Sequence, residues 1–107
     1  MTEAEELTQR VREALADQTD VVEKRMFGSI GFMVGGSLRV GVGRHPDHVM
    51  MVRIAQEDTE AALAEPGVHP AVMRGRRMRG WLFLEDEAVA SEEGLRRWVA
   101  SALAAPV

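Results

Sequence analysis

The sequence predicts a two-layer α+β fold in which an antiparallel β-meander sheet is flanked by helices, in the order α-β-β-β-β-α-β-α. Apolar residues recur with helical spacing at both ends of the chain, and short runs rich in strand-forming residues lie between them. Tight glycine turns join consecutive runs, so neighbouring strands should pair antiparallel and the terminal helices can cover one face. The length of 107 residues fits a single domain, residues 1–107, that buries roughly two-thirds of its unfolded surface.

The terminal helices are predicted from their caps and their apolar stripes. Residues 3–17 follow Thr2, which with Glu5 makes a capping box in which each side chain can satisfy the other's backbone N–H. Residues 92–103 follow Ser91, a suitable N-cap, and begin with two glutamates that suit the positive end of the helix dipole. The stripes expected to face the core are Leu7, Val11, Ala14 and Leu15 in the first helix, and Leu95, Trp98, Val99, Ala102 and Leu103 in the last.

Five strands are predicted, over residues 21–27, 30–34, 38–42, 49–54 and 80–84. The last is apolar on both faces, which favours a strand that is central in the sheet or covered on both sides. A short helix over 57–64 is ended by Pro66-Gly67, and an irregular basic stretch leads from there to the last strand. Gly28 breaks the chain after the first strand, and residues 43–48 form a turn before the fourth.

The hairpin around Gly35-Gly36 has two candidate registers. A two-residue turn pairs Phe32 with Arg39, whereas a three-residue loop that includes Ser37 pairs Phe32 with Val40. Cross-strand partners share a face, so only the second register makes one face wholly apolar. We therefore predict the three-residue loop, with these pairs: Val34 with Leu38, Phe32 with Val40, and Ile30 with Val42.

Composition excludes several classes of protein. The chain has no cysteine, which rules out disulfides, thiolate nucleophiles and cysteine-based zinc sites. Its N-terminus lacks the basic and apolar regions of a signal peptide, and no segment is long and apolar enough to span a bilayer. We therefore expect a cytoplasmic protein without membrane association. Seven methionines are interpreted as core filling, with an adaptable methionine-rich binding surface as the alternative.

Charge is unevenly distributed along the chain. The net charge of −4 argues against a generic polyanion binder, and six of the first 20 residues are acidic. Residues 66–83, in contrast, contain four arginines and no acid. These arginines can bind an anion or phosphate group, since guanidinium forks hold pairs of oxygens. The structural alternative is a solvated loop whose arginines pair with the acidic terminal helices.

Several short segments resemble the N-terminal domain of the TfoX/Sxy competence-regulator family. The segments that carry the resemblance are residues 22–28 (Val-Glu-Lys-Arg-Met-Phe-Gly), 30–34, 40–42, 51–53 and 74–81, the last ending in Met-Arg-Gly-Trp. The resemblance covers nearly the whole chain. It implies a two-layer α+β fold similar to secretion chaperones. Full-length regulators of this family add a second domain that resembles helix-hairpin-helix nucleic-acid binders, and we expect no such domain within residues 1–107.

The candidate binding residues are all basic. Arg39 and Arg53 should make the outer face of the sheet polar, opposite its apolar face. Lys24 and Arg25 offer a rim for a partner, with an ordinary strand face as the alternative interpretation. The full set of candidates is Lys24, Arg25, Arg39, Arg53, Arg74, Arg76, Arg77 and Arg79.

No catalytic or metal-binding motif is complete in this sequence. His45, Asp47 and His48 are suitable metal ligands, but they lie together in a predicted turn and are interpreted as a solvated loop. Residues 28–31 lack the Gly-x-Ser-x-Gly elbow of serine hydrolases, and residues 31–36 have P-loop spacing without the lysine that must follow. No catalytic residue, metal or cofactor is predicted, and we do not expect an enzyme.

These observations favour a non-enzymatic protein-interaction or regulatory module that binds a protein partner through the outer face of its sheet. An open sheet edge also invites pairing into a homodimer. The alternative is a nucleic-acid-associated transcriptional regulator that uses the basic loop Arg74–Arg79, whose phosphate binding would fall steeply with salt. A small-ligand-binding protein or an unrecognised enzyme is the third hypothesis.

Overall fold

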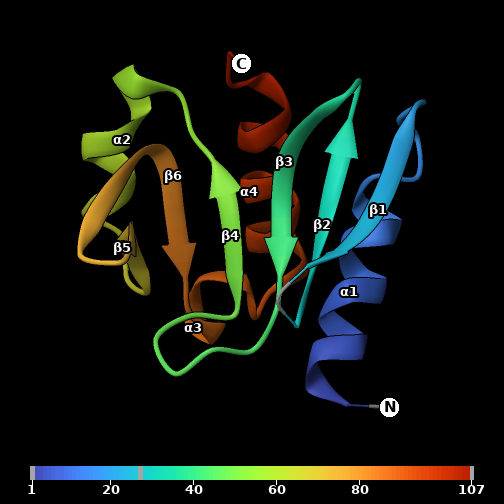
Figure 1. Cartoon of the computed structure of the whole chain (residues 1–107), viewed down its shortest axis with the longest axis horizontal. Helices are drawn as coiled ribbons and strands as arrows, with labels where there is room; N and C mark the ends of the chain where they lie inside the picture. The colour runs from blue at the N-terminus through green and yellow to red at the C-terminus, as the bar shows by residue number, and fades with distance from the viewer. Residues whose placement is uncertain (1, 27, 107) are drawn as a thin grey trace.

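The computed structural model describes residues 2–26 and 28–106, so the Phe27 end of the first predicted strand lies outside the described residues. Figure 1 shows the order of the elements along the chain. They are α1 (Glu3–Ala14), β1 (Val21–Met26), β2 (Ser29–Val34), β3 (Ser37–Val42), β4 (Met50–Arg53), α2 (Gln56–Leu63), β5 (Val68–Met73), β6 (Arg76–Leu84), α3 (Asp86–Val89) and α4 (Glu92–Ala104).

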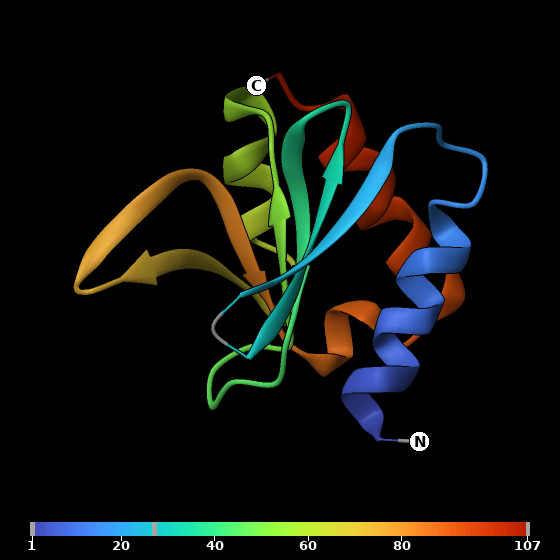
Figure 2. The ribbon, with the colours of Figure 1, turned by 45° about the vertical axis from the view of Figure 1, so that its right-hand side comes forward.

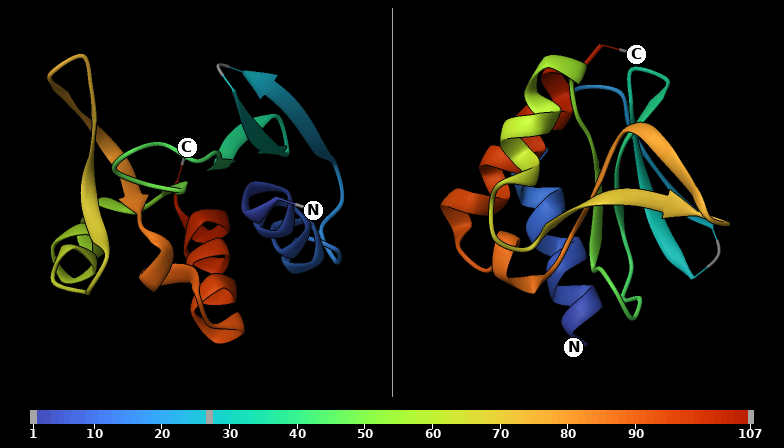
Figure 3. Two further views of the ribbon diagram at one scale, coloured as in Figure 1. Left: turned by 90° about the horizontal axis from the view of Figure 1, so that it is seen from below. Right: turned by 90° about the vertical axis from the view of Figure 1, so that its left-hand side faces the viewer.

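The strands form one antiparallel sheet in the order β1-β2-β3-β4-β6-β5. The helices lie on one side of this sheet, and the view from below in Figure 3 shows both layers. The predicted α+β fold with helices on one face is therefore confirmed. The core lies between the layers, where Phe32, Val40 and Leu82 of the sheet and Leu95 and Val99 of α4 are almost completely buried.

Both predicted helix caps are present. The side chain of Thr2 accepts a hydrogen bond from the backbone N–H of Glu5 at 3.1 Å, and Ser91 accepts one from Gly94 at 2.9 Å. The capping box is only half formed, because the Glu5 carboxylate accepts its hydrogen bond from the Thr2 hydroxyl at 3.0 Å. α1 ends at Ala14, three residues before its predicted end, since the next position of the stripe after Leu15 is the polar Gln18.

The β2–β3 hairpin corrects the predicted loop. Gly35 and Gly36 form a two-residue turn with φ of 61° and 85°, the left-handed pair that matches the twist of hairpin strands. Val34 accordingly pairs with Ser37. A bulge at Arg39 then absorbs one residue, so that Phe32 still pairs with Val40. The predicted pairs Phe32 with Val40 and Ile30 with Val42 are present. The predicted pair Val34 with Leu38 is wrong, and so is the three-residue loop.

Two elements were absent from the predicted order. The stretch expected to be irregular contains β5 and the start of β6, and α3 follows β6. β5 carries Pro70, which removes a ladder donor and is tolerated because β5 is an edge strand. The prediction that the last strand is central is confirmed, since β6 lies between β4 and β5.

Candidate functional site

One row of cross-strand partners crosses the sheet face opposite the helices. In order across the sheet, the row consists of Lys24, Gly31, Gly41, Met51, Phe83 and His69. The neighbouring residues Phe32, Val40, Val52 and Leu82 alternate with it and are buried on the helix side. Among the described residues, no helix covers the face on which this row lies (Figure 3).

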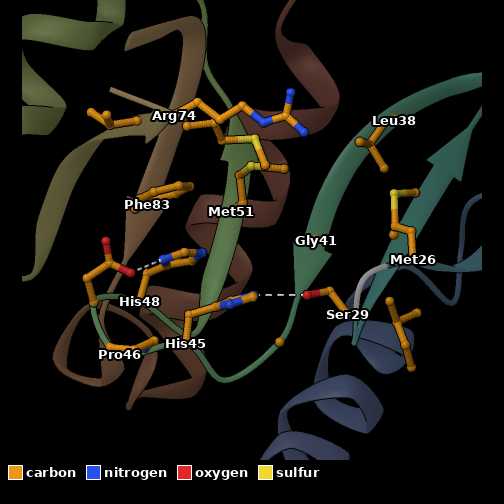
Figure 4. Close-up of a pocket in the computed structure, with 16 residues that line it drawn as sticks. Met26, Ser29, Leu38, Gly41, His45, Pro46, His48, Met51, Arg74 and Phe83 are labelled. Carbon is orange, nitrogen blue, oxygen red and sulfur yellow. Dashed lines mark hydrogen bonds and ion pairs between the residues drawn. The ribbon is translucent and has the colours of Figure 1, made fainter. Parts of the chain in front are cut away.

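The paired glycines in this row create an apolar groove of about 390 Å³. A Cβ atom added to Gly31 would lie 2.8 Å from Cε of Met26 and 2.9 Å from Cδ1 of Leu38, so these two side chains lie over the glycine floor. Met51 adjoins Gly41 in the same way, at 3.6 Å from an added Cβ. Figure 4 shows Met26 and Leu38 on one side of the groove and Met51 and Phe83 on the other.

The loop between β3 and β4 closes one end of the groove with stacked rings. The imidazole of His48 stacks on Phe83 with ring centroids 3.6 Å apart, and His45 stacks on His48 at 4.5 Å. The side chain of His48 is only 13% exposed. The interpretation of this segment as a solvated loop is therefore wrong for His48, because an aromatic partner that is distant in sequence removes its ring from water.

Two polar contacts hold this loop, and Figure 4 marks both. Ser29 Oγ lies 3.0 Å from His45 Nε2, and Asp47 Oδ1 lies 2.7 Å from His48 Nδ1. Burial lowers the pKa of His48, as does the nearby His45, while the hydrogen bond to Asp47 acts in the opposite direction. The same hydrogen bond lowers the pKa of Asp47.

This arrangement does not assemble a catalytic series of hydrogen bonds. The carboxylate of Asp47 pairs with His48 and not with His45, which is the imidazole beside Ser29. A Ser-His-Asp triad needs all three groups in sequence. Within residues 2–26 and 28–106, no cluster of three or more His, Cys, Asp or Glu side chains is placed to hold a metal ion.

The β5–β6 hairpin projects from the sheet as an arm, which Figure 2 shows clearly. Leu82 pairs with Pro70, but the next aligned pair is Arg77 with Val72, so β6 has several extra residues opposite Ala71. This bulge contains Gly80, whose φ of +85° places it in the left-handed region. Its carbonyl accepts a hydrogen bond of 2.9 Å from the N–H of Ile54, which anchors the bulge to the end of β4.

The arm presents apolar and basic side chains. Val72 and Met73 are 46% and 54% exposed. The turn at the tip is formed by Arg74 and Gly75, both with positive φ. Three residues of the arm, Val72, Met73 and Arg74, line the apolar groove, so the arm supplies one of its walls.

The eight predicted binding residues do not converge on one site. Arg74 lines the groove, and Lys24 lies at the end of the cross-strand row. A second cleft, of about 940 Å³, lies between the arm, β4 and α2. Four of the predicted residues line this cleft: Arg53, Arg76, Arg77 and Arg79. Arg25 lines a separate depression beside α1.

Arg39 lies on the opposite side of the sheet from the expected one. Its guanidinium donates hydrogen bonds to the carbonyl oxygens of Ala102, at 3.2 Å, and Ala105 at the end of α4. The bulge at this residue changes the alternation of side chains along β3, which is why the expectation from sequence fails. Arg53 keeps its expected alternation and lies with its guanidinium 5.1 Å from the centroid of the Trp81 ring.

In the part of the chain that the structure describes, no candidate basic residue forms an ion pair with an acid. Acidic residues of the helices pair elsewhere, for example Glu3 with Arg44 and Glu92 with Arg96. The structural alternative is therefore wrong in its ion pairs to the terminal helices, which are absent among the described residues, whereas Arg74, Arg76, Arg77 and Arg79 are exposed, as a solvated stretch requires.

Sequence reasoning missed the groove itself. Its floor depends on Gly31 and Gly41 meeting across two strands, and glycine within a strand is the local signal for such an opening. The methionines divide between the two interpretations. Met50 is buried in the core as expected, whereas Met51 and Met73 line the groove.

Comparison with known proteins places the chain in a family. The model of the TfoX N-terminal domain matches residues 13–106. No curated protein and no solved structure matched the chain, so the similarity to secretion chaperones stays a prediction. The described helices include none with the length and hydrophobicity needed to cross a membrane. Because the matched region covers most of the sequence, the chain belongs to the TfoX N-terminal domain family.

Proposed function

We propose that the chain is a non-enzymatic interaction module that binds an apolar segment of a regulatory protein partner in the groove on the uncovered sheet face. The observation that carries the proposal is the groove itself, with a floor of two glycines and walls of methionine, leucine and phenylalanine. Flexible methionine side chains adapt to apolar partners, and exposed apolar surface of this kind marks interaction sites.

Charge around the groove indicates which segment fits best. Arg74 lines the groove, and Lys24 lies in the same cross-strand row as its glycine floor. Neither residue has an acidic partner among the described residues. An apolar anchor flanked by carboxylates would therefore satisfy both the floor and its basic neighbours. The family's association with competence regulation supports a regulatory partner.

Filling the groove tests the proposal. Gly31→Val places a branched side chain on the floor, where the atoms that it meets are the movable ends of Met26 and Leu38. The fold should survive, since valine suits a strand and these ends can shift. Tagged wild-type protein and the variant would be used to capture partners from native lysate treated with nuclease.

The expected result is a specific partner that the wild type captures and Gly31→Val loses. Val22→Thr is the matched control, because Val22 is 48% exposed on β1 and does not line the groove. Equal capture by a folded Gly31→Val protein would remove the groove from the proposal. A homodimer stays a prediction, and light scattering at increasing concentration checks it.

A second candidate function rests on the arginines of the arm. They have no acidic partners among the described residues, which suits a nucleic-acid-associated regulator. If this candidate is correct, nuclease treatment of the lysate should remove everything that the tagged protein captures. Binding to DNA or RNA that is unchanged between low and moderate salt contradicts this candidate.

A further inference from the structure

The arginine-lined cleft between the arm, β4 and α2 is separate from the apolar groove. Four arginines line it, and Glu60 is the acidic residue among the lining side chains. These charges leave a balance of three positive charges, in a protein whose total is −4. The local excess is thus opposite in sign to the protein as a whole.

The four guanidinium groups come from two separate places in the sequence. Arg53 ends β4, whereas Arg76, Arg77 and Arg79 follow one another along the arm. The pairing of Arg53 with Trp81 brings the two segments side by side. Contact with the Trp81 ring holds the Arg53 guanidinium, and this arginine is only half-exposed. The fold therefore gathers like charges instead of dispersing them.

Within the described residues, no carboxylate forms an ion pair with these guanidinium groups. Four cations that share one cleft repel each other, and a multiply charged anion removes that repulsion. A guanidinium group can donate two hydrogen bonds to a pair of phosphate oxygens. Because few carboxylates line the cleft, its guanidinium groups are available for such a ligand. Gln56 and Thr59 add uncharged hydrogen-bonding groups from α2. The volume of about 940 Å³ is that of a small-molecule site.

We propose that this cleft binds a short phosphate chain, either inorganic polyphosphate or the triphosphate group of a nucleotide. The inference does not depend on the proposed function, because the residues that line the cleft are different from those that line the groove. Arg53 holds the phosphate from the end of β4, and Arg76, Arg77 and Arg79 hold it from the arm.

The test is a titration with inorganic tripolyphosphate and, separately, with a nucleoside triphosphate, at constant ionic strength. Two readouts apply, tryptophan fluorescence and the melting temperature. Trp81 lies under Arg53, whereas Trp98 is 2% exposed and gives a constant background. Saturable changes in both readouts are expected, together with a rise in melting temperature. Tighter binding of the nucleotide identifies it as the source of the phosphate, and equal binding identifies the free chain.

Arginine substitutions locate the site. Arg77→Gln and Arg79→Gln should each weaken binding about tenfold or more, the usual effect of losing a charged hydrogen bond. Arg74→Gln is the matched control on the same arm, since Arg74 lines the groove and not the cleft, and it should change the Kd less than about threefold. Gly31→Val should bind phosphate normally, which separates this test from that of the groove.

Several results would overturn the inference. One is the absence of saturation by either phosphate at millimolar concentration. Another is equal binding of citrate, which carries three carboxylates and no phosphate. A third is equal weakening by Arg74→Gln, which would indicate a diffuse charge effect. Binding of long oligonucleotides without binding of the short phosphates would assign the arginines to the nucleic-acid candidate instead.

Discussion

Arg39 joins the sheet to the end of the last helix: its guanidinium donates hydrogen bonds to the carbonyl oxygens of Ala102 and Ala105. Helix C-terminal carbonyls lack partners within the helix, and a cation there also suits the helix dipole. We predict that Arg39→Met lowers the free energy of unfolding by about 1.5–3 kcal/mol, the cost of losing hydrogen bonds to a charged donor. Urea denaturation measures this change. Arg96→Met is the control, because the Arg96 side chain is 56% exposed and pairs with Glu92 on its own helix. Similar losses in both variants would show that the Arg39 contacts contribute nothing specific.

Gly80 sets the bend at which the arm leaves the sheet. Its φ of +85° disfavours any side chain, although an added Cβ would lie 3.9 Å from the nearest atom, the oxygen of Ile54. The cost of Gly80→Ala is therefore conformational, about 1–2 kcal/mol, and Gly80→Asn should cost less. Gly41→Ala is the matched control, since the Cβ there makes an ordinary contact with Met51 at 3.6 Å. Thermal or urea unfolding measures all three. A Gly80→Ala protein as stable as wild type would mean that the bend is not maintained.

The turn at Gly35 and Gly36 provides a test of the two-residue hairpin. Both residues have left-handed φ, and an added Cβ at Gly35 meets nothing within 4 Å. Asn-Gly is a favoured sequence for this turn, so Gly35→Asn should stabilise the protein by about 0.4–1 kcal/mol through a smaller loss of chain entropy. Gly35→Val should destabilise it, because a β-branched residue resists positive φ. If Gly35→Val is the more stable of the two in urea, the turn has a different geometry.

His48 should make stability depend on pH. Its pKa in the folded protein lies below its ordinary value of 6.5, chiefly because of burial. The folded state therefore binds this proton less readily than the unfolded state, and stability is complete above about 6.5 and falls as pH drops toward the lowered value. One linked proton gives a slope of at most about 1.4 kcal/mol per pH unit. Urea unfolding between pH 5 and 8 measures it, where the pH limits are roughly the range in which histidine titrates.

The control for this pH dependence is His48→Phe, which keeps a ring against Phe83 and removes the titrating group. The difference in stability between the variant and the wild type should grow as the pH falls below 6.5. Parallel profiles would show that protonation of His48 has no effect on folding.

The predictions that succeeded depend on short stretches of sequence. Thr2 and Ser91 cap helices through residues three positions away, and the pairing of Phe32 with Val40 follows from the alternation of apolar residues beside a glycine turn. The prediction for β5 failed because its stabilisation comes from pairing with β6 and not from its own residues, which include a proline.

The candidate site shows the same division. The sequence alone determined that residues 66–83 concentrate arginine without acid. Only the tertiary structure decided that Arg74 lines an apolar groove, that Arg53 joins the arginines of the arm, and that Arg39 faces α4. Two bulges, one at Arg39 and one at Gly80, are the reason that the sequence alone did not place these arginines. Bulges depend on the balance of hydrogen bonds across two strands, and that balance exists only when the strands have paired.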